Sequence, residues 1–481
     1  MRRFRRLLLN LCNLRNLRLR AGGRISDWLF NLPVDFGIMT FSMIGTHPVR
    51  WFAWLLILAA ASPAQQFAPA GAAPAQTNGL EAEIRTLRER PAVKAALQHL
   101  SEQYERVIGD LVAITQVPAP SFKEQARAKF FAERLREAGL KDTHIDEEGN
   151  VVAERPGNEG EPTVMLAAHL DTVFPEGTDV RVRKKGTIYS APGVGDDSRG
   201  LAVVLAVARA MEAVQLKTKG TVVFVGDVGE EGLSNLRGTR YLFEKSPLRK
   251  RVDMFISLEG VGDTAITNGG VASKRYRVTF RGPGGHSFGA FGLVNPAFAM
   301  ASAVTRLSRI PVSRGPKTTF NVGLYAGGTS VNSIPTSCWM EVDLRSESPA
   351  ELAKLEEQFL AAMKEGAEDE NRARSTEHGA ITAESRLVGD RKGGLTPASS
   401  LLVRAAVAAT RVVGRVPMLN YSSTDANVPM ALGIPGIAMG AGGRGDRAHS
   451  PDEWVDVDKA SSMPGMERAL LVTLFLAGVV E

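Results

Sequence analysis

Residues 163–171 read TVMLAAHLD. The apolar run that opens this stretch is typical of a strand buried on both faces of a sheet, and the stretch ends in a histidine and an aspartate. Residues 221–232, TVVFVGDVGEEG, show the same pattern with two glutamates at the end. Between them, residues 201–211 are apolar on nearly every side, as expected of a buried helix. This strand–helix–strand order predicts an α/β fold with a mostly parallel sheet between layers of helices.

Similar patterns continue through the rest of the chain. Apolar periodicity and short apolar runs predict helices at 79–116, 123–138, 399–412 and 460–476 and strands at 254–258 and 436–439. A different mixture lies between, with strands at 274–281, 318–324 and 339–344 and helices at 296–307 and 349–366. We therefore expect one domain made of residues 79–270 and 384–481, interrupted by a small inserted α+β domain at 271–383.

Charge and cysteine content exclude several kinds of protein. The formal net charge of +6 comes from the first 50 residues, which hold nine arginines against Asp27 and Asp35. The rest of the chain is close to neutral, so we expect no nucleic-acid partner. Of the two cysteines, Cys12 lies in the leader and Cys338 is alone in the body. Any metal must therefore be held by histidines and carboxylates rather than by a cysteine cluster.

The N-terminal region predicts export to the periplasm or the exterior. Residues 51–61, WFAWLLILAAA, match the length of a signal-peptide core and fall short of the ~20 residues of a membrane-spanning helix. We expect translation to begin at Met39 or Met43, so that residues 1–42 are not part of the natural protein. A signal peptide (43–64) and a linker (65–78) would follow. An arginine-rich amphipathic helix, a transit peptide or a retained anchor are the alternatives for this region.

Five strand ends or loops carry a side chain of the type that binds divalent cations. They are His169, Asp196, Glu231, Glu259 and His449. Because active sites of open α/β sheets form at the carboxyl ends of the strands, we expect these side chains to meet at one edge. Singly, each has an ordinary explanation, such as a helix-capping aspartate or a solvated acidic loop. Their occurrence together, in a chain with seven histidines, favours a metal centre.

The five side chains divide evenly between two cations if Asp196 bridges them. Each cation then receives one histidine, Asp196 and one glutamate and keeps an open position for water, as catalytic zinc sites do. Cobalt or manganese would also suit these ligands. Asp171 follows His169 closely and is a candidate to fix its ring. Glu230, beside Glu231, is a candidate general base.

Together these motifs resemble the co-catalytic zinc exopeptidase and aminoacylase family over about residues 105–481. The family includes peptidase T, carboxypeptidase G, aminoacylase-1, acetylornithine deacetylase and succinyl-diaminopimelate desuccinylase. The resemblance implies two zinc ions held by the five ligands, with Asp196 bridging and the peptide bond between Asp196 and Asp197 cis. It further implies that Glu230 takes a proton from a water between the zinc ions and that Asp171 orients the first histidine.

The predicted insert resembles the lid of that family, the part that closes over the substrate. His286, within GPGGHS at 282–287, is implied to contact the substrate carbonyl, often from the partner subunit of a dimer. Asn332 and Arg345 are implied to hold the amide or carboxylate of the substrate. Without the resemblance, turn and strand-edge roles would explain all three. The resemblance therefore implies a homodimer formed through the lid.

The expected reaction is hydrolysis of an amide bond near a free terminus. We expect an exopeptidase acting on short peptides, because the motifs most resemble the peptidase T and carboxypeptidase branches and because export suits peptide scavenging. An N-acyl-amino-acid deacylase of the same family is the alternative, since Arg345 suits the carboxylate of either substrate. A non-catalytic binding protein on the same fold is a third hypothesis, which the presence of Glu230 and all five ligands disfavours.

Overall fold

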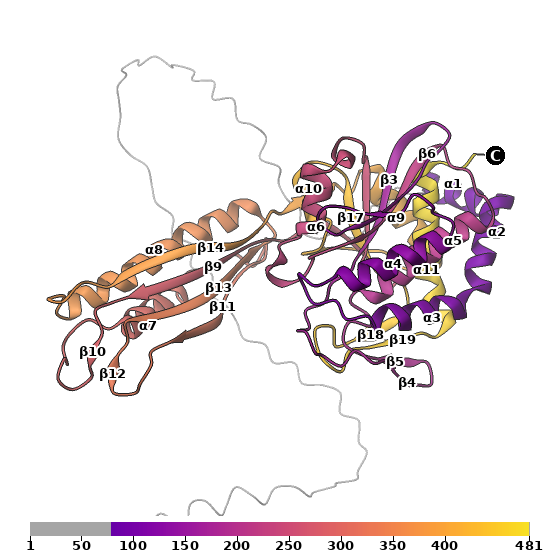
Figure 1. Cartoon of the computed structure of the whole chain (residues 1–481). Helices are drawn as coiled ribbons and strands as arrows, with labels where there is room; N and C mark the ends of the chain where they lie inside the picture. The colour runs from indigo at the N-terminus through magenta and orange to yellow at the C-terminus, as the bar shows by residue number, and fades with distance from the viewer. Residues whose placement is uncertain (1–77, 481) are drawn as a thin grey trace, which may run out of the picture. The chain divides into compact units, whose positions relative to one another are not determined.

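The computed structural model describes residues 78–480. The predicted upstream sequence, the signal peptide and the linker up to residue 77 lie outside the described residues. Within residues 78–480, no helix is both long and apolar enough to cross a membrane. These residues form an α/β domain and an inserted α+β domain, so the predicted fold class is confirmed (Figure 1).

A mixed sheet forms the centre of the larger domain. Across the described residues its nine strands are ordered β1-β2-β6-β3-β7-β17-β8-β15, with β16 paired to β8. They are β1 (His144–Ile145), β2 (Val151–Arg155), β3 (Gly160–His169), β6 (Gly220–Asp227), β7 (Met254–Leu258), β8 (Ala265–Gly270), β15 (Gly394–Leu395), β16 (Met418–Ser422) and β17 (Gly436–Met439). Strands β6, β3, β7 and β17 run parallel, so their carboxyl ends share one edge.

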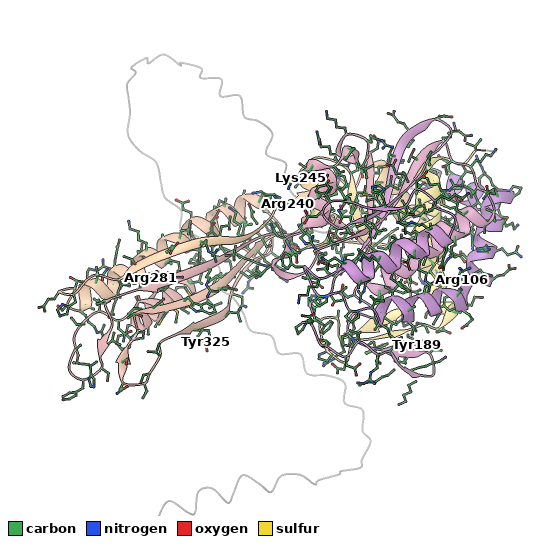
Figure 2. All side chains as sticks on the ribbon, viewed as in Figure 1. Arg106, Tyr189, Arg240, Lys245, Arg281 and Tyr325 are labelled. Carbon is green, nitrogen blue, oxygen red and sulfur yellow. The ribbon has the colours of Figure 1, made fainter. Side chains whose placement is uncertain are left out.

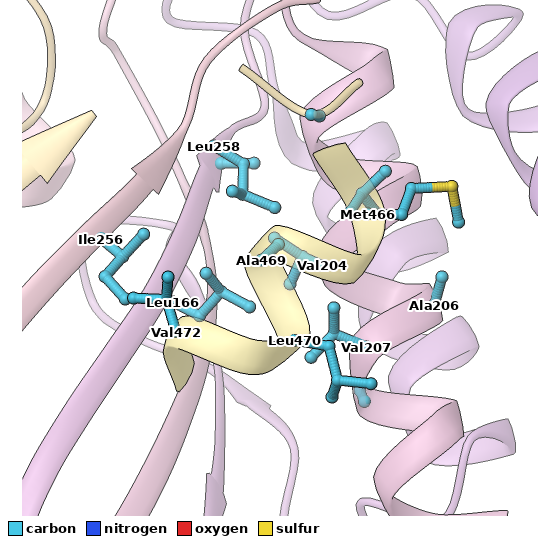
Figure 3. Close-up of a cluster of buried hydrophobic side chains, with 14 of the residues drawn as sticks. Leu166, Val204, Ala206, Val207, Ile256, Leu258, Met466, Ala469, Leu470 and Val472 are labelled. Atoms are coloured by element: carbon cyan, nitrogen blue, oxygen red, sulfur yellow. The ribbon is translucent and has the colours of Figure 1, made fainter. Parts of the chain in front are cut away.

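Helices cover both faces of this sheet, because its central strands are apolar on both sides. They are α1 (Asn78–Glu89), α2 (Pro91–Glu102), α3 (Tyr104–Thr115), α4 (Gln125–Glu137), α5 (Ser198–Ala213), η1 (Gly232–Ser234), α6 (Arg237–Arg240), η2 (Tyr241–Lys245), η3 (Pro247–Lys250), α9 (Leu401–Val412), α10 (Asn427–Ala431) and α11 (Lys459–Ala477). Alternate residues of β3 belong to different cores: Leu166 packs with Val204 of α5 and Leu470 of α11 (Figure 3), and Met165 packs with Val428 of α10.

The inserted domain is a four-stranded antiparallel sheet in the order β11-β13-β9-β14. Its elements are β9 (Ala272–Arg281), β10 (Gly285–His286), α7 (Pro296–Leu307), β11 (Thr318–Gly327), β12 (Ser333–Ile334), β13 (Ser337–Ser346), α8 (Pro349–Ala373) and β14 (Thr382–Arg391). Val278 and Phe280 of β9 pack with Phe359 of α8, which explains the alternating pattern of that strand. We call residues 272–391 the insert. The boundary expected at residue 383 falls inside β14, which pairs with β9.

A third, smaller sheet joins two loops that are distant in sequence. Its order is β18-β19-β5-β4, with β4 (Arg183–Lys185), β5 (Ile188–Ser190), β18 (Arg444–Asp446) and β19 (Trp454–Asp456). Trp454 of β19 lies opposite Ser190 of β5. This pairing brings the glycine-rich turn at 193–197 close to the loop that carries His449.

Candidate metal centre

His169 is the last residue of β3 and is fully buried. Its Nδ1 lies 3.0 Å from the backbone oxygen of Asp171, which can only accept, so Nδ1 carries the hydrogen. Its Nε2 lies 2.9 Å from Asp196 Oδ1 and 3.7 Å from Glu259 Oε1. The ring is therefore held with one nitrogen directed at two carboxylates, as a metal ligand must be.

The two adjacent aspartates at residues 196 and 197 have different roles. Asp197 caps α5 by accepting from Gly200 N at 3.0 Å, and it also accepts from His169 N at 3.2 Å and Gly260 N at 3.0 Å. It thus ties the ends of β3, β7 and α5 together. Asp196 is left free to face the histidines, and the Asp196–Asp197 peptide bond is cis, as the resemblance implies.

Asp196 stands between two groups of ligands. Its Oδ1 faces His169, and its Oδ2 lies 3.1 Å from Nε2 of His449, which in turn lies 2.9 Å from Glu231 Oε1. The ligand atoms of His169, Asp196 and Glu259 lie within 4.8 Å of one another, and so do those of Asp196, Glu231 and His449. Oε2 of Glu259 is buried and has no hydrogen-bond partner. This donor set fits two divalent cations that share one carboxylate.

The charges of these groups depend on one another. Burial opposes protonation of His169, but Asp171, Asp196 and Glu259 outweigh it and raise the pKa of His169 well above its ordinary value. Hydrogen bonds to Asp196 and Glu231 raise the pKa of His449 to about 10. Burial also opposes ionisation of Asp196, but the two histidines lower its pKa below the ordinary value. Because a metal ligates neutral imidazole, cations and protons compete for this centre.

Asp171 links His169 to the loop that carries Glu230 and Glu231. Its carboxylate is fully buried and accepts from Glu230 N at 2.9 Å, Glu231 N at 3.1 Å and Ser121 Oγ at 2.8 Å. The same carboxylate lies 3.5 Å from His169 Nδ1, farther than the backbone oxygen of Asp171. The side chain therefore holds the backbone of the two glutamates, and the main chain of Asp171 fixes the histidine ring.

Glu230 lies in the loop after β6 and is 5% exposed. Its Oε1 accepts from Arg391 Nη1 at 2.9 Å, and Arg391 also donates to the backbone oxygen of Glu230 and to Ser423 Oγ. Burial raises the pKa of Glu230 to about 8, although Arg391 opposes the shift. A carboxyl group with such a pKa suits proton transfer near neutral pH.

Sequence reasoning missed two residues that contact this centre. Arg391 ends β14, a mostly polar strand that no sequence pattern marks, so only its pairing with β9 reveals it. Glu453 is four residues after His449 and accepts from the backbone N–H of Asp196 at 2.8 Å. Burial raises the pKa of Glu453 to about 7. Its position near a predicted ligand was the one available signal.

The three residues expected to contact the substrate all lie in the insert. His286 of β10 accepts from Gly289 N at 3.2 Å, and β10 pairs with β12 next to Asn332. Arg345 of β13 donates to Asp343 Oδ2 at 2.6 Å. Among the described residues, none of the three makes a hydrogen bond or ion pair with the metal-centre side chains. Their roles toward substrate stay predictions.

The match to known proteins agrees with this geometry. Residues 165–469 match the model of Peptidase family M20/M25/M40, well over half of the chain. The chain belongs to this family. It is 24% identical over 380 residues to succinyl-diaminopimelate desuccinylase of Corynebacterium glutamicum, covering 76% of this chain and 97% of that protein. The resemblance to the zinc exopeptidase and aminoacylase family is thereby confirmed.

Solved structures of the family share the fold. Aminopeptidase PepT from Bacillus cereus superposes with a TM-score of 0.62 at 22% identity, over 77% of this chain and 99% of that one. A Bacillus subtilis protein described as a dinuclear metal binding peptidase from the M20 family gives 0.57 at 18% identity, over 78% and 98%. The family is metal-dependent, and its members hydrolyse peptide or amide bonds. This chain is therefore an enzyme of that class.

Proposed function

We propose that this chain is an exopeptidase that hydrolyses short peptides at a centre of two zinc ions, with Glu230 as general base. The observation that carries the proposal is the position of Asp196, whose two oxygens face two histidines at 2.9 and 3.1 Å. Each side has its own glutamate, Glu259 or Glu231, within reach of the same atoms. A carboxylate shared between two cations needs this arrangement.

Zinc ions held there would polarise the scissile carbonyl and lower the pKa of a water molecule. Glu230 would take the proton from the attacking water and return it to the leaving amine. Arg391 fixes the direction of this carboxylate by holding Oε1 at 2.9 Å. Arg345 would bind a free carboxylate of the substrate, and His286 would donate to the carbonyl oxygen as it gains negative charge.

The second candidate function is an N-acyl-amino-acid deacylase. The observation in its favour is the similarity to a desuccinylase over 97% of that protein's length. In both reactions Glu230 would act as general base and the same five side chains would bind the metal ions. They differ in whether an amino acid or a simple acyl group stands on the carbonyl side of the bond.

The deciding experiment is hydrolysis by zinc-loaded protein of di- and tripeptides, N-blocked peptides and N-acyl amino acids, with Glu230→Ala as the control. Cleavage of free peptides that the variant abolishes supports the exopeptidase. Cleavage of N-acyl amino acids alone would move the assignment to the deacylase. Comparing zinc with cobalt and manganese in the same assay tests the identity of the metal.

We further propose a homodimer formed through the insert. Strand β11 lies at the edge of the insert sheet, and its Leu324 and Tyr325 are 56% and 73% exposed; Tyr325 is labelled in Figure 2. An edge strand presents unpaired backbone groups that a second strand can bind. Sedimentation of the wild type and of Tyr325→Lys tests this: a dimer that the substitution dissociates is expected, and a monomeric wild type would contradict it.

Export is a separate proposal, which rests on the apolar segment at 51–61 followed by small residues. Cell fractionation with N-terminal sequencing of the mature protein tests it. We expect a start near residue 62 or 65 in the exported fraction. Recovery of the uncleaved chain in the membrane fraction would favour a retained anchor instead.

A further inference from the structure

Glu453 has a buried carboxylate whose oxygens both bind the turn that carries Asp196. The residue is 2% exposed. Its Oε1 accepts from Gly195 N at 2.7 Å and Asp196 N at 2.8 Å, and its Oε2 accepts from Gly193 N at 2.9 Å. Three N–H donors within four residues bind this one carboxylate and fix the turn as a unit, because each N–H would otherwise lack this acceptor.

The backbone of Glu453 also connects the segment before the Asp196 turn with the loop that carries His449. Its carbonyl oxygen accepts from Ala191 N at 3.1 Å, and its N–H donates to Ser450 O at 3.1 Å, next to His449. The side chain and main chain of one residue therefore join the turn of one ligand to the loop of another.

The two histidine ligands differ in how firmly they are held. His169 is fully buried at the end of a central strand. The side chain of His449 is 56% exposed, and its backbone has a φ of 64°, in the left-handed region that non-glycine residues rarely adopt. His449 thus depends on its loop for its position, and the N–H of Glu453 supplies one of the bonds within that loop, to Ser450 O at 3.1 Å.

We propose that Glu453 is a positioning residue for the metal site formed by Asp196, Glu231 and His449. The proposal rests on the two-metal function proposed above. The carboxylate holds the turn of Asp196, which both sites share. Its removal is expected to weaken the site of Asp196, Glu231 and His449 more than that of His169, Asp196 and Glu259, since His169 and Glu259 lie at the ends of β3 and β7. The consequence is a protein that binds one cation firmly and the second weakly.

The test is Glu453→Gln, which keeps the shape but offers one acceptor oxygen where three N–H groups need acceptors. The matched control is Glu370→Gln in the insert, a glutamate 4% exposed that accepts from Asn295 N at 2.8 Å. Bound zinc is measured per chain by mass spectrometry after dialysis against a series of buffered free zinc concentrations. We expect about 10–100-fold weaker binding of the second ion in Glu453→Gln alone.

Two zinc ions bound to Glu453→Gln with wild-type affinity would overturn the proposal. If that variant does not fold by circular dichroism, Gly195→Ala takes its place, because a Cβ there would lie 2.8 Å from Glu453 Oε1 and displace it from the other side. Retention of both ions by Gly195→Ala would equally overturn the proposal. A wild type that binds no zinc would instead refute the proposed two-metal function, so the two failures are distinguishable.

Discussion

Replacing Asp171 by asparagine separates two roles that its carboxylate has in this structure. The first is to fix the ring of His169, as the sequence predicts. The second, which the contacts favour, is to hold the loop of Glu230 and Glu231 through their backbone N–H groups at 2.9 and 3.1 Å. The backbone oxygen of Asp171 remains in the variant and lies 3.0 Å from His169 Nδ1, so the tautomer of the histidine is expected to survive.

The magnitude follows from the hydrogen bonds that are lost. An amide has one acceptor oxygen, so either the N–H of Glu230 or that of Glu231 would face the NH₂ group. Leaving one buried donor unsatisfied costs about 1–3 kcal/mol, and the surviving bond loses about 1 kcal/mol of charge assistance. We expect Asp171→Asn to lower the free energy of unfolding by about 2–4 kcal/mol. We expect kcat to fall by about 100-fold or more, because Glu230, the proposed general base, would be displaced.

The assay combines urea unfolding, steady-state kinetics, zinc content and hydrogen exchange of the peptide that contains residues 230–231. Faster exchange of these two amides with two zinc ions still bound is the expected result. The control is Asp253→Asn near the other end of β3, where, within residues 78–480, the carboxylate accepts only from Thr163 N and the amide oxygen of asparagine can still do so. Loss of zinc with unchanged exchange at 230–231 would refute the reasoning, because the carboxylate would then act through His169.

Three further predictions follow from the same contacts. Glu230→Gln should lower kcat about 10²–10⁴-fold with both metals retained; loss of metal in a folded variant would contradict this. The raised pKa of His449, about 10 against an ordinary 6.5, means that its ion pairs stabilise the metal-free fold at pH 6.5 and below and that this stability is lost as pH rises toward 10. Chelator-stripped protein should therefore show a Tm that falls over that range, and a flat profile would argue against it. Leu166→Ala, in the core of Figure 3, should lower the free energy of unfolding by about 2–5 kcal/mol in urea titrations; a smaller loss would indicate local collapse.

The parts of the fold that are apolar in sequence were predictable. The strand expected at 254–258 is β7, and the helix expected at 296–307 is α7. The long helical segment at 79–116 is divided into α1, α2 and α3, with Pro91 opening the second helix. Such elements are set by local pattern, so their bounds can be inferred without knowledge of what they contact.

The residues that escaped prediction depend on contacts between distant segments. Strand β14 is mostly polar and partly exposed, so its sequence lacks the apolar run that marks a strand. It is a strand because it pairs with β9, which is about 110 residues earlier in the chain. Arg391 and Glu453 share this origin, because their partners lie 161 and 257 residues away. The clustering of the proposed metal ligands was predictable for the opposite reason, since acidic and histidine side chains at the ends of apolar strands are conspicuous in the sequence itself.

Buried arginines tie down the backbone beside two of the loops that carry the proposed ligands. Arg127 donates to the backbone oxygens of Val117 and Leu170, both at 2.9 Å, and Leu170 is adjacent to the first histidine ligand. Arg468 donates to Gly440 O at 2.8 Å, before the loop of the last ligand. A guanidinium group carries five donors, so one side chain satisfies several loop carbonyls that no strand pairs. Structural zinc sites, by contrast, fold only when the ion is bound. Because hydrogen bonds of the chain itself hold the backbone beside these loops, we expect removal of the proposed cations to abolish activity and leave the fold intact.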